Sequence, residues 1–204
     1  MKRTAIAVLF GTVLIFGQAT SAQTIDDNAA TAIAADESLV AKEFSLPEHL
    51  EATVWAEAPM FYNPTNIDVD QFGRVWVAEA VNYRSFKAQD DGRMKHEAGD
   101  RVIILEDTDG DGRADKSTVF VQDLDLVAPL GIAVFDNRVI VSCSPSLIMY
   151  TDIDRDGRFD PAIDHKQVFL SGFGGVDHDH GVHAVVAGPD GRWYFTVGNA
   201  GPHI

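Results

Sequence analysis

A pattern of β-strands repeats along this chain and restricts its fold more than any other feature. Each unit has a strand, a tight turn containing Asp, an Arg and a second strand. The pattern occurs three times, with first strands at Pro64–Asp70, Val127–Val134 and Val182–Ala187. Two units continue with a third strand, an aspartate-rich loop and a fourth strand, and these loops begin 45 residues apart, at Asp107 and Asp152. A four-strand repeat of about 40–50 residues is typical of a β-propeller blade.

The repeat predicts an all-β protein, a β-propeller of four-stranded blades. A β-sandwich also has short strands between turns, but it would not repeat one four-strand order at one period. Two blades and the opening hairpin of a third can be recognised, whereas a closed propeller has about four to eight blades. We therefore expect an incomplete propeller of about two to three blades, the N-terminal part of a longer protein.

The first 43 residues are expected to lie outside the propeller. A positively charged start, an apolar run at Ala5–Gly17 and small residues before Gln23 predict a signal peptide at residues 1–22. Residues 23–43 are interpreted as a flexible linker and residues 44–204 as the propeller domain. The expected localisation is periplasmic or secreted, and membrane association would require that the signal stays uncleaved.

Charge and cysteine content exclude several classes of function. The net charge of −15 and the isoelectric point of about 4.6 argue against nucleic acid, which is bound through Lys and Arg. The single cysteine, Cys143, cannot form a disulfide within the chain or a Cys-x-x-Cys-His haem attachment site. It lies in a strand-like run with no cationic neighbour, which predicts a buried structural thiol.

The two aspartate-rich loops predict calcium sites with a structural role. Each matches the first nine positions of a calcium loop, with oxygens at positions 1, 3, 5, 7 and 9 and Gly at position 6. Thr118 and Ile163 replace the bidentate Glu of position 12. The alternative is a polar turn whose Asp side chains bond to their own backbone. The candidate ligands are Asp107, Asp109, Asp111, Arg113 and Asp115 in the first loop and Asp152, Asp154, Asp156, Arg158 and Asp160 in the second.

A cluster of histidines and aspartates precedes the last strand pair. It contains Asp177, His178, Asp179, His180 and His183. Such residues could bind a transition metal, although their spacing matches no specific zinc motif. They could also provide a general base, because a neighbouring aspartate can orient a histidine and raise its basicity. The third interpretation is a solvated loop.

These motifs resemble a known family. The stretches Asp179–His183, Gly188–Gly191 and Tyr194–Gly201 resemble soluble quinoprotein glucose/sorbosone dehydrogenases, six-bladed propellers that use pyrroloquinoline quinone and calcium. Gly73–Glu79 and Leu105–Phe120 are more specifically similar to a subgroup of membrane-bound dehydrogenases of planctomycetes and verrucomicrobia. In that subgroup a haem-binding cytochrome c domain often follows the propeller.

The resemblance implies an exported dehydrogenase that oxidises a sugar or other alcohol. His180 matches the family's catalytic base, while Ala184 replaces an Arg of the glucose enzymes. The implied cofactors are pyrroloquinoline quinone and calcium, with haem only if a cytochrome c domain follows. The implied electron acceptor is a protein such as a cytochrome c. The expected cofactor-binding residues are Glu79, Asn82, Arg84 and His183.

Two other functions are compatible with the residues. A calcium-dependent lactonase or hydrolase would use carboxylates and the metal to activate water. A non-catalytic binding platform would keep the aspartate loops but would not need His180. For Glu79, Asn82 and Arg84, the alternative to lining the channel is an ordinary solvated loop. Because propellers host many functions, the fold does not choose among these functions.

Overall fold

The computed structural model describes residues 5–7, 45, 47–48, 50, 52–83, 95–174 and 180–198. The chain divides into two units, Met1–Glu57 and Ala58–Ile204. In the first unit, β1 (Ala5–Ala7) pairs in parallel with β2 (Ala52–Val54). Most of the predicted signal peptide and all of the predicted linker lie outside the described residues, so both remain predictions.

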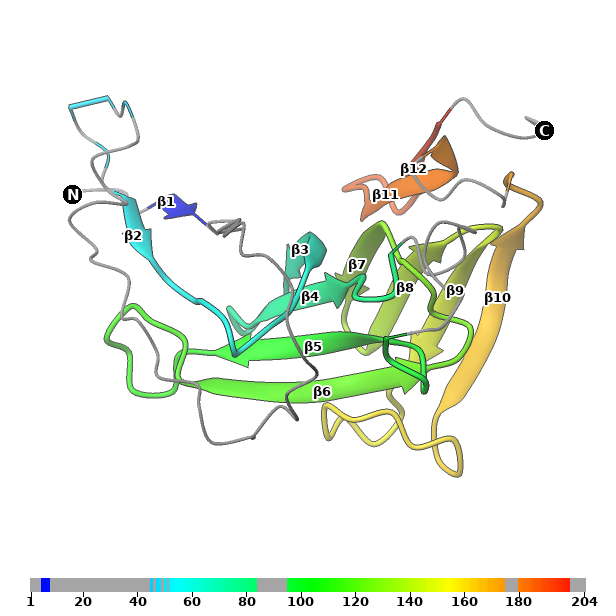
Figure 1. Ribbon diagram of the computed structural model, residues 1–204, viewed down its shortest axis with the longest axis horizontal. Helices are drawn as coiled ribbons and strands as arrows, with labels where there is room; N and C mark the ends of the chain where they lie inside the picture. Colours follow the sequence, from blue (N-terminus) through cyan, green and yellow to red (C-terminus); the bar gives the residue numbers. More distant parts are fainter. Residues whose placement is uncertain are drawn as a thin grey trace, which may run out of the picture. The chain divides into compact units, whose positions relative to one another are not determined.

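The described part of the second unit consists of strands joined by turns and loops. The strands are β3 (Pro64–Val69), β4 (Val75–Glu79), β5 (Asp100–Glu106), β6 (Lys116–Asp123), β7 (Gly131–Phe135), β8 (Arg138–Cys143), β9 (Ser146–Thr151), β10 (His165–Ser171), β11 (Val182–Ala187) and β12 (Trp193–Val197). They form two four-stranded antiparallel sheets, β3-β4-β5-β6 and β7-β8-β9-β10, and the hairpin β11-β12 (Figure 1). We call the two sheets blade 1 and blade 2.

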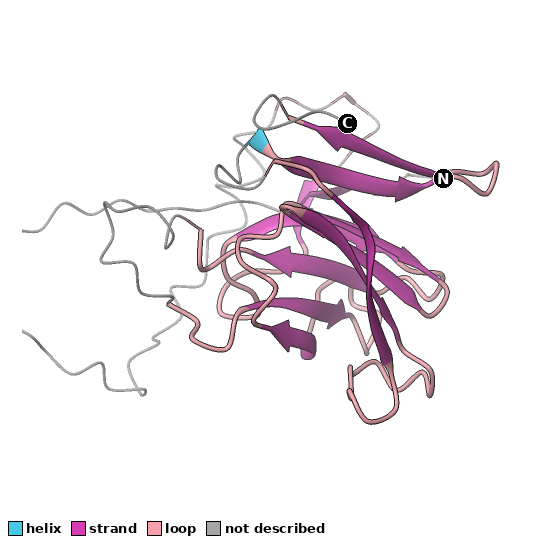
Figure 2. Ribbon diagram, turned by 90° about the vertical axis from the view of Figure 1, so that its right-hand side faces the viewer, coloured by secondary structure: helices cyan, strands magenta, loops and turns pink. Residues whose placement is uncertain are grey.

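The arrangement of the sheets is that of a β-propeller. The first strand of blade 1, β3, packs against β7, the first strand of blade 2, and β7 packs against β11. The described residues are strands and loops apart from a helical turn at His180, directly before the hairpin (Figure 2). The predicted all-β propeller of four-stranded blades is confirmed for two blades and a further opening hairpin. In the described ranges, none of the elements is a helix long and apolar enough to cross a membrane.

The hydrophobic core lies between successive blades, in one cluster on each side of blade 2. The central strand of that blade is therefore buried on both faces. In β8, Val139, Val141 and Cys143 join the cluster between blades 1 and 2. Ile140, which points to the opposite face, joins the cluster between blade 2 and the hairpin. This alternation follows from the two-residue period of a strand. Each blade therefore needs its neighbour to cover an apolar face.

The connection between blades 1 and 2 differs from the prediction. The predicted strand Val127–Val134 was wrong at its start, because β7 begins at Gly131. Ala128 has a φ of 54°, which a strand residue does not adopt, and Pro129 has no amide hydrogen for a sheet. The amide of Ala128 donates instead to the buried carboxylate of Asp100, at 2.7 Å.

Cys143 is a buried structural thiol, as predicted. Its sulfur lies 3.2 Å from the carbonyl oxygen of Val127 and 3.3 Å from the Val127 amide nitrogen. Burial raises the pKa of the thiol to about 12. The side chain is therefore a neutral group at physiological pH that helps to hold the connection between the blades.

The aspartate in the first turn has the most bonds of the three turn aspartates. Asp70 accepts hydrogen bonds from the indole of Trp76 at 2.9 Å and from Arg74, whose Nε lies at 2.7 Å. Burial raises the pKa of the Asp70 carboxyl, but these bonds outweigh burial and the net pKa is lowered. In the second turn, Asp136 pairs with Arg155 of a distant loop instead, at 2.6 Å.

We expect the Asp70→Asn variant to be less stable than the unmodified protein at pH 7. Charged hydrogen bonds of this kind contribute about 1.5–3 kcal/mol. Because the folded pKa is lowered, this stabilisation is present above the unfolded pKa of about 3.9 and is lost as the pH falls through the folded value. Urea unfolding between pH 2 and 7 should show the difference shrinking below about pH 4. A difference that stays constant with pH would contradict this account.

Candidate functional site at one end of the blades

Antiparallel pairing places the connections of each blade alternately at two ends (Figure 1). The histidine end comprises the connections β4–β5, β6–β7, β8–β9 and β10–β11. The aspartate end comprises the turns β3–β4, β7–β8 and β11–β12 and the loops β5–β6 and β9–β10. Two hydrogen bonds lie at the histidine end. The Ala128 amide of the connection between the blades donates to Asp100 of blade 1, and the Val182 amide of the hairpin donates to the Ser144 hydroxyl of blade 2. His180 and the two aspartate loops therefore lie at opposite ends.

His180 is exposed on a short helical turn directly before β11. The next residue, Gly181, packs so closely on blade 2 that a Cβ there would collide with the Ser144 hydroxyl. The Val182 amide donates to that hydroxyl at 3.1 Å, and the Gly198 amide donates to the Gly181 carbonyl at 2.7 Å. Blade 2 and β12 thus fix the backbone that presents the imidazole to solvent.

The other members of the histidine cluster are only partly described. His183 is half-buried in β11, and its carbonyl accepts a hydrogen bond from the Ser142 hydroxyl of β8. Asp177, His178 and Asp179 lie outside the described residues. The predicted transition-metal site and the predicted cofactor contact of His183 therefore remain predictions.

Glu79 is fully buried at the end of β4. One carboxylate oxygen accepts a hydrogen bond from Arg101 Nε at 2.6 Å, and the other accepts one from the Tyr62 amide at 2.7 Å. The guanidinium carbon of Arg101 lies 5.8 Å from the centroid of the Tyr62 ring. Both oxygens of Glu79 are thus bonded to protein groups, which gives this residue a structural role.

Asn82 is also fully buried and holds the β4–β5 connection. Its side-chain nitrogen donates to the His96 carbonyl at 3.0 Å, and its side-chain oxygen accepts from the His96 amide at 2.8 Å. Its backbone amide donates to Asp100, whose pKa is raised by burial. The predicted cofactor contacts of Glu79 and Asn82 remain predictions, and Arg84 lies outside the described residues.

Both aspartate loops bring their first three carboxylates together. In each loop, one oxygen from each of these residues lies within 4.8 Å of the others. The two sets are Asp107, Asp109 and Asp111, and Asp152, Asp154 and Asp156. The arrangement has the oxygen donors that a hard divalent cation prefers.

The first loop donates hydrogen bonds to both oxygens of its first and last aspartates. Asp107 accepts hydrogen bonds from the Gly110 amide at 2.7 Å and from the Gly112 amide at 2.9 Å, one to each oxygen. Asp115 accepts from the Thr108 hydroxyl at 2.7 Å and from the Thr108 amide at 3.1 Å. The Thr108 hydroxyl holds the pKa of Asp115 below its ordinary value. Asp115 therefore closes the loop on itself.

The second loop uses an aspartate that the spacing analysis missed. Asp164 accepts hydrogen bonds from the Ile153 amide at 2.8 Å and from the Asp160 amide at 2.7 Å. It thus replaces Asp115 of the first loop, whereas the nine-residue spacing selected Asp160. A usable signal was present, because Asp115 and Asp164 each directly precede the last strand of their blade.

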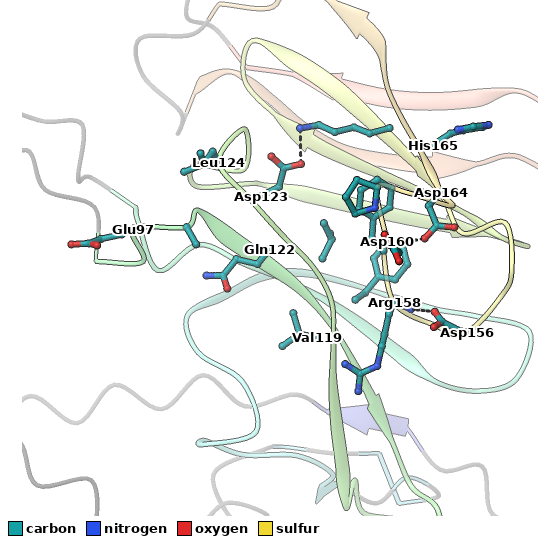
Figure 3. A pocket seen from close by; sticks show the side chains of 16 residues that line it. Glu97, Val119, Gln122, Asp123, Leu124, Asp156, Arg158, Asp160, Asp164 and His165 are labelled. Carbon is teal, nitrogen blue, oxygen red and sulfur yellow. Dashed lines mark hydrogen bonds and ion pairs between the residues drawn. The ribbon is translucent and has the colours of Figure 1, made fainter.

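A groove of about 1350 Å³ lies between β6 and the second aspartate loop (Figure 3). In Figure 3, Gln122 and Leu124 lie on its blade 1 side and Asp164 on its loop side. Lys166 also lines the groove and pairs with Asp123 at 2.5 Å. The predicted calcium ligands Asp156, Arg158 and Asp160 line the groove, whereas His180 and the residues predicted to bind the quinone are not among its lining residues.

A family model matches residues 36–204. The chain belongs to this family, a domain of unknown function named DUF7133. No curated protein and no solved structure matches the chain. The DUF7133 match spans both blades and the hairpin, so His180 and both aspartate loops lie within it.

Proposed function

We propose that this DUF7133 protein is an exported dehydrogenase of the quinoprotein type that oxidises a sugar or another alcohol. One observation carries the proposal: His180 is exposed directly before β11, the first strand of the hairpin, and the residues that follow it, Gly181 and Val182, pack on Ser144 of blade 2. In the quinoprotein dehydrogenases that this stretch resembles, the same position provides the catalytic base. The fold and this position together favour the dehydrogenase over other propeller functions.

In the proposed reaction, His180 accepts the proton of the substrate hydroxyl at a ring nitrogen. A histidine suits this step because its ordinary pKa of about 6.5 lies near neutral pH. Pyrroloquinoline quinone, when bound, would supply the acceptor for the hydride. The side-chain oxygens of Glu79 and Asn82 already accept hydrogen bonds from other protein groups. Among the described residues, the proposal therefore assigns a role in the reaction to His180 alone.

The separation of the two ends supports this choice over the hydrolase. A hydrolase built on the aspartate loops would have its reacting water at the end opposite His180. A binding platform stays the second candidate, because it needs neither a base nor a quinone.

Reconstitution of the full-length protein tests the proposal. We expect dye reduction with a sugar or alcohol that depends on added pyrroloquinoline quinone and calcium. The His180→Ala variant should lose at least about 100-fold in rate, the lower range for removal of a general base. The control is His165→Ala, because His165 is an exposed histidine at the aspartate end and should leave the rate unchanged.

The outcomes separate the candidates. If the protein shows no quinone-dependent activity with any sugar or alcohol, the dehydrogenase proposal is wrong and the binding platform becomes the better account. If activity is present but His165→Ala lowers it as much as His180→Ala does, the assignment of the base is wrong.

A further inference from the structure

One buried carboxylate oxygen in the second aspartate loop has no hydrogen-bond partner. Asp152 is only 6 % exposed. Its Oδ2 accepts from the Gly157 amide at 3.0 Å, but Oδ1 has no partner among the described residues. A buried carboxylate oxygen without a partner is unfavourable, so its presence in a native fold requires a reason.

The first loop has no such oxygen. Both oxygens of Asp107, the equivalent residue, accept hydrogen bonds from amides in their own loop. The amide that serves the first oxygen of Asp107 belongs to Gly110. In the second loop Arg155 stands at this position. Its amide faces the Asp152 carboxyl without meeting the geometry of a hydrogen bond to Oδ1, and its guanidinium bonds to Asp136 at 2.6 and 2.8 Å. The two loops share a sequence pattern, but only in the second loop does a buried oxygen of the first aspartate lack a hydrogen-bond partner.

The Asp152 carboxylate belongs to a cluster whose other two members are exposed. Oxygens of Asp152, Asp154 and Asp156 lie within 4.8 Å of one another, and Asp154 and Asp156 are exposed. Three carboxylates at this spacing repel one another in the absence of a cation. A cation bound here would be a ligand partner for the Asp152 carboxylate, whose Oδ1 has none, and would remove the repulsion.

We propose that residues 152–156 bind a calcium ion, and that they bind it more tightly than the first loop does. Calcium suits the site because it takes six to eight oxygen ligands in a flexible geometry. Carboxylates provide such ligands, whereas zinc sites in proteins usually contain Cys or His. The inference concerns a structural ion and is independent of the proposed dehydrogenase activity.

The position of the loop shows what the ion would stabilise. Beyond the aspartates, the Phe159 amide of the loop donates to the Phe120 carbonyl of blade 1 at 2.7 Å. The Phe159 ring packs edge-on against Phe120 and against Tyr150 of blade 2, at centroid distances of 6.5 and 5.1 Å. Gly157 lies beside Ile104 of blade 1. An ion that orders this loop would therefore fasten blade 2 to blade 1.

Calcium titration of the chelator-treated full chain tests the proposal. We expect calorimetry to detect a calcium site. Calcium at about 100 times the dissociation constant should raise the melting temperature by about 5–10 °C. Asp154→Asn should weaken binding at least about 10-fold and remove most of the shift. The matched control is Asp109→Asn, the same position of the first loop, and it should keep both the affinity and the shift.

Three results would overturn the assignment. The first is the absence of a calcium-dependent shift in the unmodified chain. The second is a loss of the shift in Asp109→Asn and its retention in Asp154→Asn. The third is an equal loss in both variants. Because Asp154 is exposed, both variants should melt like the unmodified chain in the presence of chelator, which separates loss of the ion from damage to the fold. None of these results bears on the quinone-dependent activity.

Discussion

Replacement of Phe120 by alanine is expected to lower the free energy of unfolding by about 3–5 kcal/mol. Phe120 is 2 % exposed in β6 and belongs to the core between the two blades. Its ring packs edge-on against Trp76 at 4.9 Å between centroids, and Tyr150 and Phe159 of blade 2 lie 6.4 and 6.5 Å away. The truncation would leave a cavity at the place where the blades meet.

Urea unfolding followed by circular dichroism measures the effect, with Phe72→Ala as the control. Phe72 is 73 % exposed in the β3–β4 turn, so its removal should change the stability by no more than about 0.5 kcal/mol. Equal effects of the two substitutions would show that the core between the blades does not determine stability. A Phe120→Ala transition that splits into two steps would show that this side chain couples the unfolding of the blades.

The strands could be predicted from sequence because each depends on local signals. Alternating apolar residues and an Asp-containing turn specify a hairpin without reference to the rest of the chain. The start of β7 was missed for the opposite reason. Val127 and Leu130 look like strand residues, but the segment between them bonds to Asp100, which lies 28 residues from Ala128. No local pattern announces such a partner.

The candidate site was predictable in position but not in bonding. The position of His180 before an inner strand follows from the repeat, and the structure places it there. The spacing rule also located both aspartate loops. It could not show that both oxygens of Asp107 accept hydrogen bonds whereas Oδ1 of Asp152 accepts none, because this difference depends on the orientation of the backbone amides in each loop. The role of Asp164 was hidden by four additional residues before β10.

We expect the Glu79→Gln variant to lose about 3–5 kcal/mol of unfolding free energy. The substitution keeps the shape of the side chain but removes its charge, so Arg101 would keep a positive charge beside a fully buried neutral group. Arg101 is 22 residues away in the sequence, and the pair joins β4 to β5. The large expected loss comes from the uncompensated charge rather than from the net contribution of the pair.

This substitution also separates the structural role of Glu79 from the predicted cofactor contact. If the role is structural, Arg101→Gln should be similarly destabilising, and the double variant should lose much less than the sum of the two single losses, because neither charge is then left alone. Urea unfolding of the four proteins in the cycle supplies these values. A loss below about 1 kcal/mol for Glu79→Gln, together with weaker quinone binding, would instead assign Glu79 to the cofactor. The buried ion pair predicts the first result, since both carboxylate oxygens already have protein partners.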